Sequence, residues 1–216
     1  MAKVISISIG KHSIDYLLSG TLGDKVYCIK NGIQYTRSRP VRSLKPRSAA
    51  QLAHSAKFKA IMKFLKPLTV FIHSGFKDEH AAMSPFNLAM SYNFKNALTG
   101  TFPDYEIDYS KALLSHGNLP GAINPAASLI SAGEIKFTWE DNRNAMANDR
   151  VLLVVYNPAK QQVSTIEGGN TRMERSQTIS VPSTFIGDKV QCYTAFQNAK
   201  LSEVSNSQCV GSLTVK

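Results

Sequence analysis

The chain has 216 residues, of which 43% are hydrophobic, and its mean hydropathy is −0.15. These values are typical of a folded protein with one large domain or two small ones, and they exclude a disordered chain. No apolar run approaches the roughly 18–20 residues that span a bilayer, and no cleavage site follows the amino-terminal segment. We therefore expect synthesis in the cytoplasm without a signal peptide and without a membrane span.

The net charge of +10 is distributed unevenly along the chain. Residues 1–77 carry fourteen lysines and arginines against two acids, a net +12, whereas residues 78–216 carry eleven against thirteen, a net −2. No acid occurs between Asp24 and Asp78. Because charge of one sign repels itself and weakens a compact fold, this asymmetry predicts an anionic partner, either a nucleic acid or an acidic protein.

Residues 1–47 read as strands and turns. The amino-terminal end alternates valine or isoleucine with serine, which is typical of a strand. Two β-rich runs, 26–29 and 33–36, flank Asn31 and Gly32, and this pair predicts a two-residue hairpin because both turn positions need positive φ. The expected register places Lys30 opposite Ile33, Cys28 opposite Tyr35, Ile29 opposite Gln34 and Tyr27 opposite Thr36.

A basic segment with two prolines, Pro40 and Pro46, follows the hairpin and is expected to be extended. Ser48 and Gln51 then form a capping-box pattern that begins a helix, and Pro67 ends or kinks this helix. Three of its lysines fall within about 60° of one another on the side opposite its apolar residues. The predicted contacts to a nucleic acid or another anionic partner are Arg37, Arg39, Arg42, Lys45, Arg47, Lys59, Lys63 and Lys66.

A second helix is predicted from Ser84 as N-cap, Pro85 at the first helical position and Gly100 at the C-cap. We expect it to pack against the first helix as an antiparallel pair, with a short helical turn at residues 78–83. Residues 101–124 read as a loop because prolines and glycines interrupt them.

Three acids, Asp104, Glu106 and Asp108, alternate with apolar and aromatic residues inside this loop. One interpretation is a half-buried strand with an acidic outer face. A second is an acidic patch that docks the basic segment of a neighbouring subunit, and a third is a divalent-metal site. The sequence leaves these three alternatives open.

The carboxyl-terminal region alternates short strands with turns. Seven strands in so short a stretch predict an antiparallel β-sandwich of the immunoglobulin or fibronectin III kind, with Trp139 as a core aromatic and Tyr193 at a tyrosine corner. The expected strands cover residues 129–131, 134–140, 150–157, 162–166, 176–181, 189–198 and 209–215. The fold class is therefore α+β: an N-terminal β-hairpin and helical-pair domain over residues 1–123, then an immunoglobulin-like sandwich over 124–216.

The residue types that usually act as catalytic groups or metal ligands form no recognisable motif. The sequence contains no nucleophile elbow, P-loop, dinucleotide-binding motif or zinc-protease motif, and its five histidines lack ligand spacing. Cys28, Cys192 and Cys209 imply no disulfide framework and are expected to be thiols, with a Cys192–Cys209 pair as the alternative. We therefore expect no enzymatic activity, no cofactor and no metal.

Several short segments, at specific spacing, carry a family resemblance. They include Lys30-Asn31-Gly32-Ile33, Arg37-x-Arg39-Pro40, the run from Ser48 to Lys59, Gly75-Phe76-Lys77, the run from Asn87 to Asn93, the run from Tyr105 to Tyr109, the run from Phe137 to Asp141 and the run from Leu153 to Asn157. The chain resembles, over residues 20–216, an uncharacterised family common in Bacteroidota and some of their mobile elements. The resemblance implies the two-part architecture and a bacterial or phage origin, and it lends no chemistry; residues 1–19 look like an extension.

Two functions of different classes fit this sequence. The first is a structural protein that self-associates, such as a phage-like particle or fibre subunit, whose basic N-terminal region contacts packaged nucleic acid or an acidic neighbouring subunit. The alternative is a cytoplasmic protein that binds nucleic acid independently of sequence, with Tyr27 or Tyr35 stacking on bases. A solvated basic surface that binds nothing, and a glycan-binding module, remain further alternatives. We favour assembly.

Overall fold

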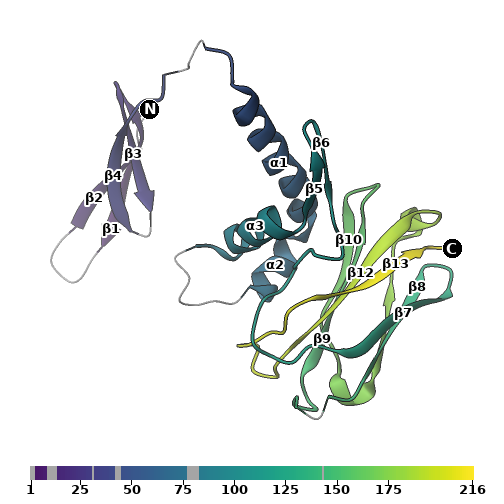
Figure 1. Ribbon diagram of the computed structural model, residues 1–216. Coiled ribbons are helices and arrows are strands. Elements are labelled where there is room, and N and C mark those ends of the chain that lie inside the picture. Colours follow the sequence, from purple (N-terminus) through teal and green to yellow (C-terminus); the bar gives the residue numbers. More distant parts are fainter. Residues whose placement is uncertain (1–2, 9–13, 31, 42–44, 77–82, 143) are drawn as a thin grey trace. The chain divides into compact units, whose positions relative to one another are not determined.

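The computed structural model is a mixed α+β chain with antiparallel sheets (Figure 1). Its contacts divide the chain into two compact units, Met1–Arg47 and Ser48–Lys216, which we call the N-terminal unit and the main unit. No helix in the described part of the chain is long and apolar enough to cross a membrane. The residues that the structure describes are 3–8, 14–30, 32–41, 45–76, 83–142 and 144–216.

The N-terminal unit is a four-stranded antiparallel sheet in which consecutive strands are neighbours. Its strands are β1 (Lys3–Ser8), β2 (Ile14–Leu22), β3 (Lys25–Lys30) and β4 (Ile33–Ser38). The predicted hairpin register is confirmed, including Lys30 opposite Ile33 and Cys28 opposite Tyr35. Gly32 has the expected positive φ of 78°, whereas Asn31 lies outside the described residues.

The main unit begins with the predicted helix. Ser48 and Gln51 form the capping box: the Gln51 amide donates to Ser48 Oγ at 3.3 Å, and the Ser48 amide donates to Gln51 Oε1 at 3.0 Å. Pro67 ends α1, but the chain turns once as a 3-10 helix and becomes helical again, which the sequence pattern did not predict. The three elements are α1 (Ala49–Leu65), η1 (Lys66–Leu68) and α2 (Thr69–Gly75).

The second predicted helix, α3 (Pro85–Asn96), begins at the expected N-cap Ser84, but its predicted C-cap is wrong. The helix ends at Asn96, and Gly100 lies in strand β5 (Leu98–Thr101), which pairs with β6 (Asp104–Ile107). Gly100 has φ of 84° there, and a Cβ would approach the Asp104 carbonyl oxygen to 2.4 Å. The glycine therefore serves a close strand contact and not a helix end. All but the last of residues 78–83 lie outside the described part of the chain.

All seven predicted strands of the carboxyl-terminal region are present in two antiparallel sheets. One sheet has the order β10-β9-β12-β13 and the other the order β11-β8-β7. The strands are β7 (Ile123–Ser131), β8 (Glu134–Glu140), β9 (Arg150–Asn157), β10 (Gln162–Thr171), β11 (Ser176–Ser180), β12 (Lys189–Gln197) and β13 (Gln208–Thr214). Short 3-10 turns, η2 (Arg172–Glu174) and η3 (Ser183–Phe185), precede and follow β11.

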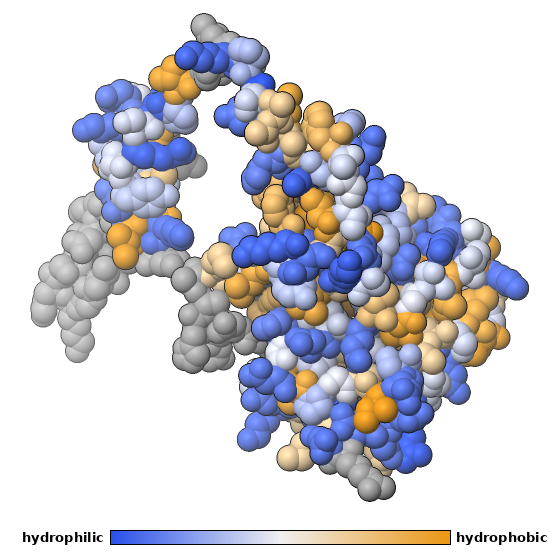
Figure 2. All heavy atoms as spheres, in the orientation of Figure 1, coloured by the Kyte–Doolittle hydropathy of each residue, from blue (hydrophilic) through white to orange (hydrophobic). Residues whose placement is uncertain are grey.

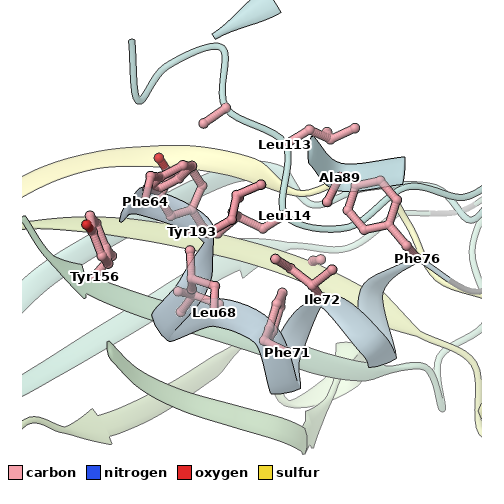
Figure 3. Packing of buried hydrophobic residues seen from close by; sticks show 14 of the residues in the cluster. Phe64, Leu68, Phe71, Ile72, Phe76, Ala89, Leu113, Leu114, Tyr156 and Tyr193 are labelled. Atoms are coloured by element: carbon pink, nitrogen blue, oxygen red, sulfur yellow. The ribbon is translucent and has the colours of Figure 1, made fainter. Parts of the chain in front are cut away.

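Two hydrophobic clusters lie on opposite faces of the four-stranded sheet. The helix-side cluster joins α1, α2 and α3 to Leu152, Val154 and Tyr156 of β9, as Figure 3 shows for part of it. The sheet-side cluster joins the intervening residues of β9 to β8 and β11. The division predicted from composition, 1–123 and 124–216, differs from the division by contacts, because the helices and the sheet share the helix-side cluster.

Trp139 and Tyr193 occupy different environments. Trp139 is buried in the sheet-side cluster as predicted, with its ring 5.4 Å from that of Phe196. Tyr193 lies in the middle of β12 and faces the helix-side cluster, and its hydroxyl donates to the backbone oxygen of Tyr109 at 2.8 Å. It therefore joins two distant segments and does not form the local tyrosine corner that we expected.

All three cysteines are free thiols. Cys192 lies in the sheet-side cluster, whereas Cys209 packs against the helix-side cluster, so the two thiols face opposite sides of the same sheet. Burial raises the pKa of the Cys192 thiol to about 12. The alternative of a Cys192–Cys209 disulfide is therefore incompatible with this arrangement.

Arg172 forms a buried ion pair with Asp149; the two side chains are 4% and 1% exposed. Its Nε donates to Asp149 Oδ2 at 3.0 Å, and its Nη1 donates to the Gly121 carbonyl at 3.0 Å. The guanidinium carbon lies 3.7 Å from the centre of the Phe196 ring. One arginine thus connects the chain before β7 to the end of β10.

Replacing Arg172 by methionine should lower the free energy of unfolding by about 3–5 kcal/mol, because it leaves the Asp149 carboxylate buried without a counter-charge. The matched control is Arg175→Met, which removes an exposed ion pair with Asp141 and should cost less than about 1 kcal/mol. Urea denaturation followed by circular dichroism measures both values. Equal losses for the two variants would contradict this account of the buried pair.

Candidate functional site: basic surfaces and an aromatic pocket

The predicted arginines lie at the end of the N-terminal unit. Arg37 is exposed on β4, where strand alternation places it on the same face as Tyr35. Arg39 is also exposed, and its backbone amide donates to the Asp24 carbonyl at 2.7 Å. Lys45 and Arg47 are exposed in a stretch without helix or strand; Arg42 lies outside the described residues.

The three predicted lysines lie on the main unit. Lys59 and Lys63 are exposed on α1, and Lys66 is exposed in the 3-10 turn that follows. The opposite side of α1 buries Ile61, Phe64 and Leu65, so the lysines are on the solvent side as predicted. The helix contains no acid, and none of the three lysines forms an ion pair within the described ranges. The predicted contact residues therefore belong to two basic surfaces, one on each unit.

The acidic segment is the outer side of a half-buried strand. Along β6, Asp104 and Glu106 are exposed while Tyr105 and Ile107 are half-buried. Asp108, after the strand, is held locally: hydrogen bonds from Ser110 and then the Lys111 ammonium lower the pKa of its carboxyl. No group of metal-ligating side chains occurs in the part of the chain that the structure describes.

A pocket of about 320 Å3 lies between α1, β6 and the end of β9. We call it the aromatic pocket. Sequence reasoning did not find it, because its walls come from three segments that only the fold brings together. Its aromatic and charged lining residues are Lys63, Phe64, Tyr105, Glu106, Tyr109 and Tyr156.

The rings of the aromatic pocket pack edge to face. The centre of the Phe64 ring lies 5.2 Å from that of Tyr156 and 5.7 Å from that of Tyr109. On the wall formed by β6, the Lys57 ammonium lies 5.3 Å from the centre of the Tyr105 ring, at cation–π distance. A positively charged group is therefore already held against this wall.

Tyr156 is 2% exposed, yet its hydroxyl makes no hydrogen bond with any residue that the structure describes. Burial raises the pKa of Tyr156, and burial and then Glu106 raise the pKa of Tyr109. Both phenols therefore stay protonated at neutral pH. The pocket offers neutral hydroxyls, aromatic rings, one ammonium and one carboxylate, a set suited to binding and without an activated nucleophile.

The fold and these surfaces define an α+β protein with exposed basic surfaces and an aromatic pocket. The chain belongs to the family described as "Family of unknown function (DUF6266)", whose model matches residues 17–211. The resemblance to an uncharacterised family is thereby confirmed, while the bacterial group and the mobile-element origin stay predictions. No curated protein sequence matches the chain.

Two tyrosine variants test how the rings at this site are held. Tyr193→Phe removes a buried hydrogen bond and leaves the Tyr109 carbonyl unpaired, so the free energy of unfolding should fall by about 1–2 kcal/mol. Tyr156→Phe removes a hydroxyl without a described partner and should change stability by less than about 0.5 kcal/mol. Urea denaturation of both variants gives the comparison. A larger loss for Tyr156→Phe would contradict the hydrogen bonding described above.

Proposed function

We propose that this protein is a non-enzymatic structural subunit that self-associates through its N-terminal unit, as in a phage-like particle or fibre. Its basic residues contact acidic neighbouring subunits or packaged nucleic acid. In this proposal the chain is made in the cytoplasm and is then incorporated into the particle. The following observations support it.

The observation that carries the proposal is the exposure of the described side chains of the N-terminal sheet. Among its described side chains, from Leu18 to Arg47, none is buried. Leu22 is 59% and Ile33 is 71% exposed, and Figure 2 shows hydrophobic residues beside hydrophilic ones on the described part of this sheet. Because a small sheet needs a covered apolar face for stability, we infer that a partner surface covers the exposed apolar residues of this one.

The free edge of β4 supplies a second contact. Lys30 and Ile33 flank a two-residue turn and form a hydrogen-bonded pair, so the backbone groups of Ile33, Tyr35 and Arg37 face β3. Those of Gln34, Thr36 and Ser38 face outward and can pair with a strand of another subunit.

We further propose that the two sheets of the main unit form an immunoglobulin-like sandwich. Their seven strands are antiparallel, the sheets share the sheet-side cluster, and the chain passes from one sheet to the other after β8, after β10 and after β11. Such a unit is a rigid body that can present the N-terminal unit to its neighbours.

A proline at the β4 edge tests assembly. Thr36→Pro removes an outward amide without removing a bond to β3, so it should weaken self-association about tenfold for one lost hydrogen bond. Thr36→Val keeps the amide and the β-branched side chain, and it should associate like the parent. Analytical ultracentrifugation over a concentration series measures both. A parent chain that stays monomeric at its highest soluble concentration would refute the proposal.

The second candidate function is sequence-independent binding of nucleic acid. It is favoured by Lys59, Lys63 and Lys66, which are exposed and form no ion pair with described residues. Lys63 also lines the aromatic pocket. Lysines of this kind bind phosphates, and aromatic rings stack on bases. This function is compatible with assembly around a nucleic acid.

Replacing Lys59, Lys63 and Lys66 by alanine should reduce the salt dependence of single-strand binding by about 2 in log–log slope, since each phosphate contact contributes about 0.7. The matched control replaces Lys189, Lys200 and Lys216, which are exposed elsewhere on the main unit. Fluorescence anisotropy with a labelled random DNA and RNA measures the slopes. This function is wrong if the parent binds neither polymer at about 50 mM salt.

A further inference from the structure

We propose that the aromatic pocket accepts an arginine side chain from the N-terminal unit of a second copy of this chain. The inference rests on the proposed self-association and identifies the surface on the neighbour that receives the basic segment. It assigns Glu106 of β6 to an interface, as the counter-charge of the arginine.

The pocket has the groups that bind a guanidinium. Glu106 is an exposed carboxylate on its wall and forms no ion pair with a described residue. Tyr105 and Tyr109 supply ring surfaces, and the buried Tyr156 has a hydroxyl without a described partner. A guanidinium is planar, stacks on aromatic rings and donates in several directions at once, so it can engage the rings, the carboxylate and a phenol oxygen together.

The position of Lys57 shows that the β6 wall of the pocket holds a cation. Its ammonium lies 5.3 Å from the centre of the Tyr105 ring, on a strand whose exposed residues are acids. Lys63 is the opposing feature, because its positive charge lines the same pocket. Lys63 therefore weakens the docking of an arginine, so removing its charge should strengthen self-association.

The charge of the chain identifies the occupant. The N-terminal unit offers Arg37, Arg39 and Arg47, all exposed and without an ion pair to described residues. The N-terminal unit carries nine lysines and arginines against two acids, a net +7, and the main unit carries sixteen against thirteen, a net +3. The attraction is therefore local, between an arginine of one copy and the Glu106 carboxylate of another. Arg37 and Arg39 also lie at the end of β4, whose free edge is the proposed assembly contact.

Three single variants of the full chain test the pocket by analytical ultracentrifugation. Glu106→Gln should weaken self-association about tenfold through loss of the counter-charge. Asp104→Asn removes an exposed acid from the same strand outside the pocket and should change the affinity less than about twofold. Lys63→Ala should strengthen self-association by removing the repulsion, while nucleic-acid binding by Lys63 predicts weaker binding to DNA for the same variant.

A charge swap shows whether the contact joins two copies. One full-length variant carries Glu106→Arg, and the other carries Arg37→Glu, Arg39→Glu and Arg47→Glu. Each alone places like charges at the pocket contact and should associate more weakly than the parent, whereas an equimolar mixture restores opposite charges in both directions and should associate more strongly than either variant. A mixture that associates no more strongly than the separate variants contradicts docking between copies.

The outcomes separate this inference from the proposed function. A monomeric parent refutes self-association itself. If the parent associates, and the Glu106→Gln and Asp104→Asn variants associate equally strongly, only the pocket contact is refuted. Circular dichroism and urea denaturation of every variant should match the parent, because the replaced side chains are exposed.

Discussion

The structure of the main unit depends on burying both faces of strand β9. Every residue from Val151 to Asn157 is buried, and successive side chains belong alternately to the helix-side and the sheet-side cluster. The strand therefore cannot shift without disturbing both layers, so α1 has a fixed position over the sheet. Tyr156 lies next to the end of this strand and Phe64 packs on it, so the same constraint fixes the position of these two rings of the aromatic pocket.

Where the chain is neither helix nor strand, a buried polar side chain supplies the hydrogen bonds that hold it against the helices. The Asn93 amide nitrogen donates to the carbonyls of Ala89 and Leu113, each at 2.8 Å, and its oxygen accepts from the Leu113 amide at 2.9 Å. Asn93 is fully buried and thereby holds the chain after β6 against α3. Among the described residues, Asp149 Oδ1 and Thr194 Oγ1 are buried side-chain atoms without a hydrogen-bond partner. In the N-terminal sheet no side chain of known exposure is buried, and the proposed contact with a partner lies there.

Local signals predicted the elements of this fold well, since each depends on a few adjacent residues. The capping box at Ser48 and the hairpin register around Gly32 are examples. The failures concern positions whose environment is distant in sequence. Gly100 has the positive φ of a helix cap but serves a strand contact, and α2 follows a proline because a proline is tolerated in a first turn. The aromatic pocket and the role of Tyr193 depend on tertiary packing, which no local pattern encodes.

The two proposed contacts differ in symmetry, and this difference bears on assembly. Two β4 edges that pair with each other form a contact between identical surfaces, which closes after two copies. An arginine that docks in the aromatic pocket joins different surfaces, so each copy can donate to one neighbour and accept from another. A subunit with only the first contact forms dimers. In this proposal a subunit with both can link dimers into rings or fibres, because the arginines of the N-terminal unit and Glu106 of the main unit lie far apart in the sequence.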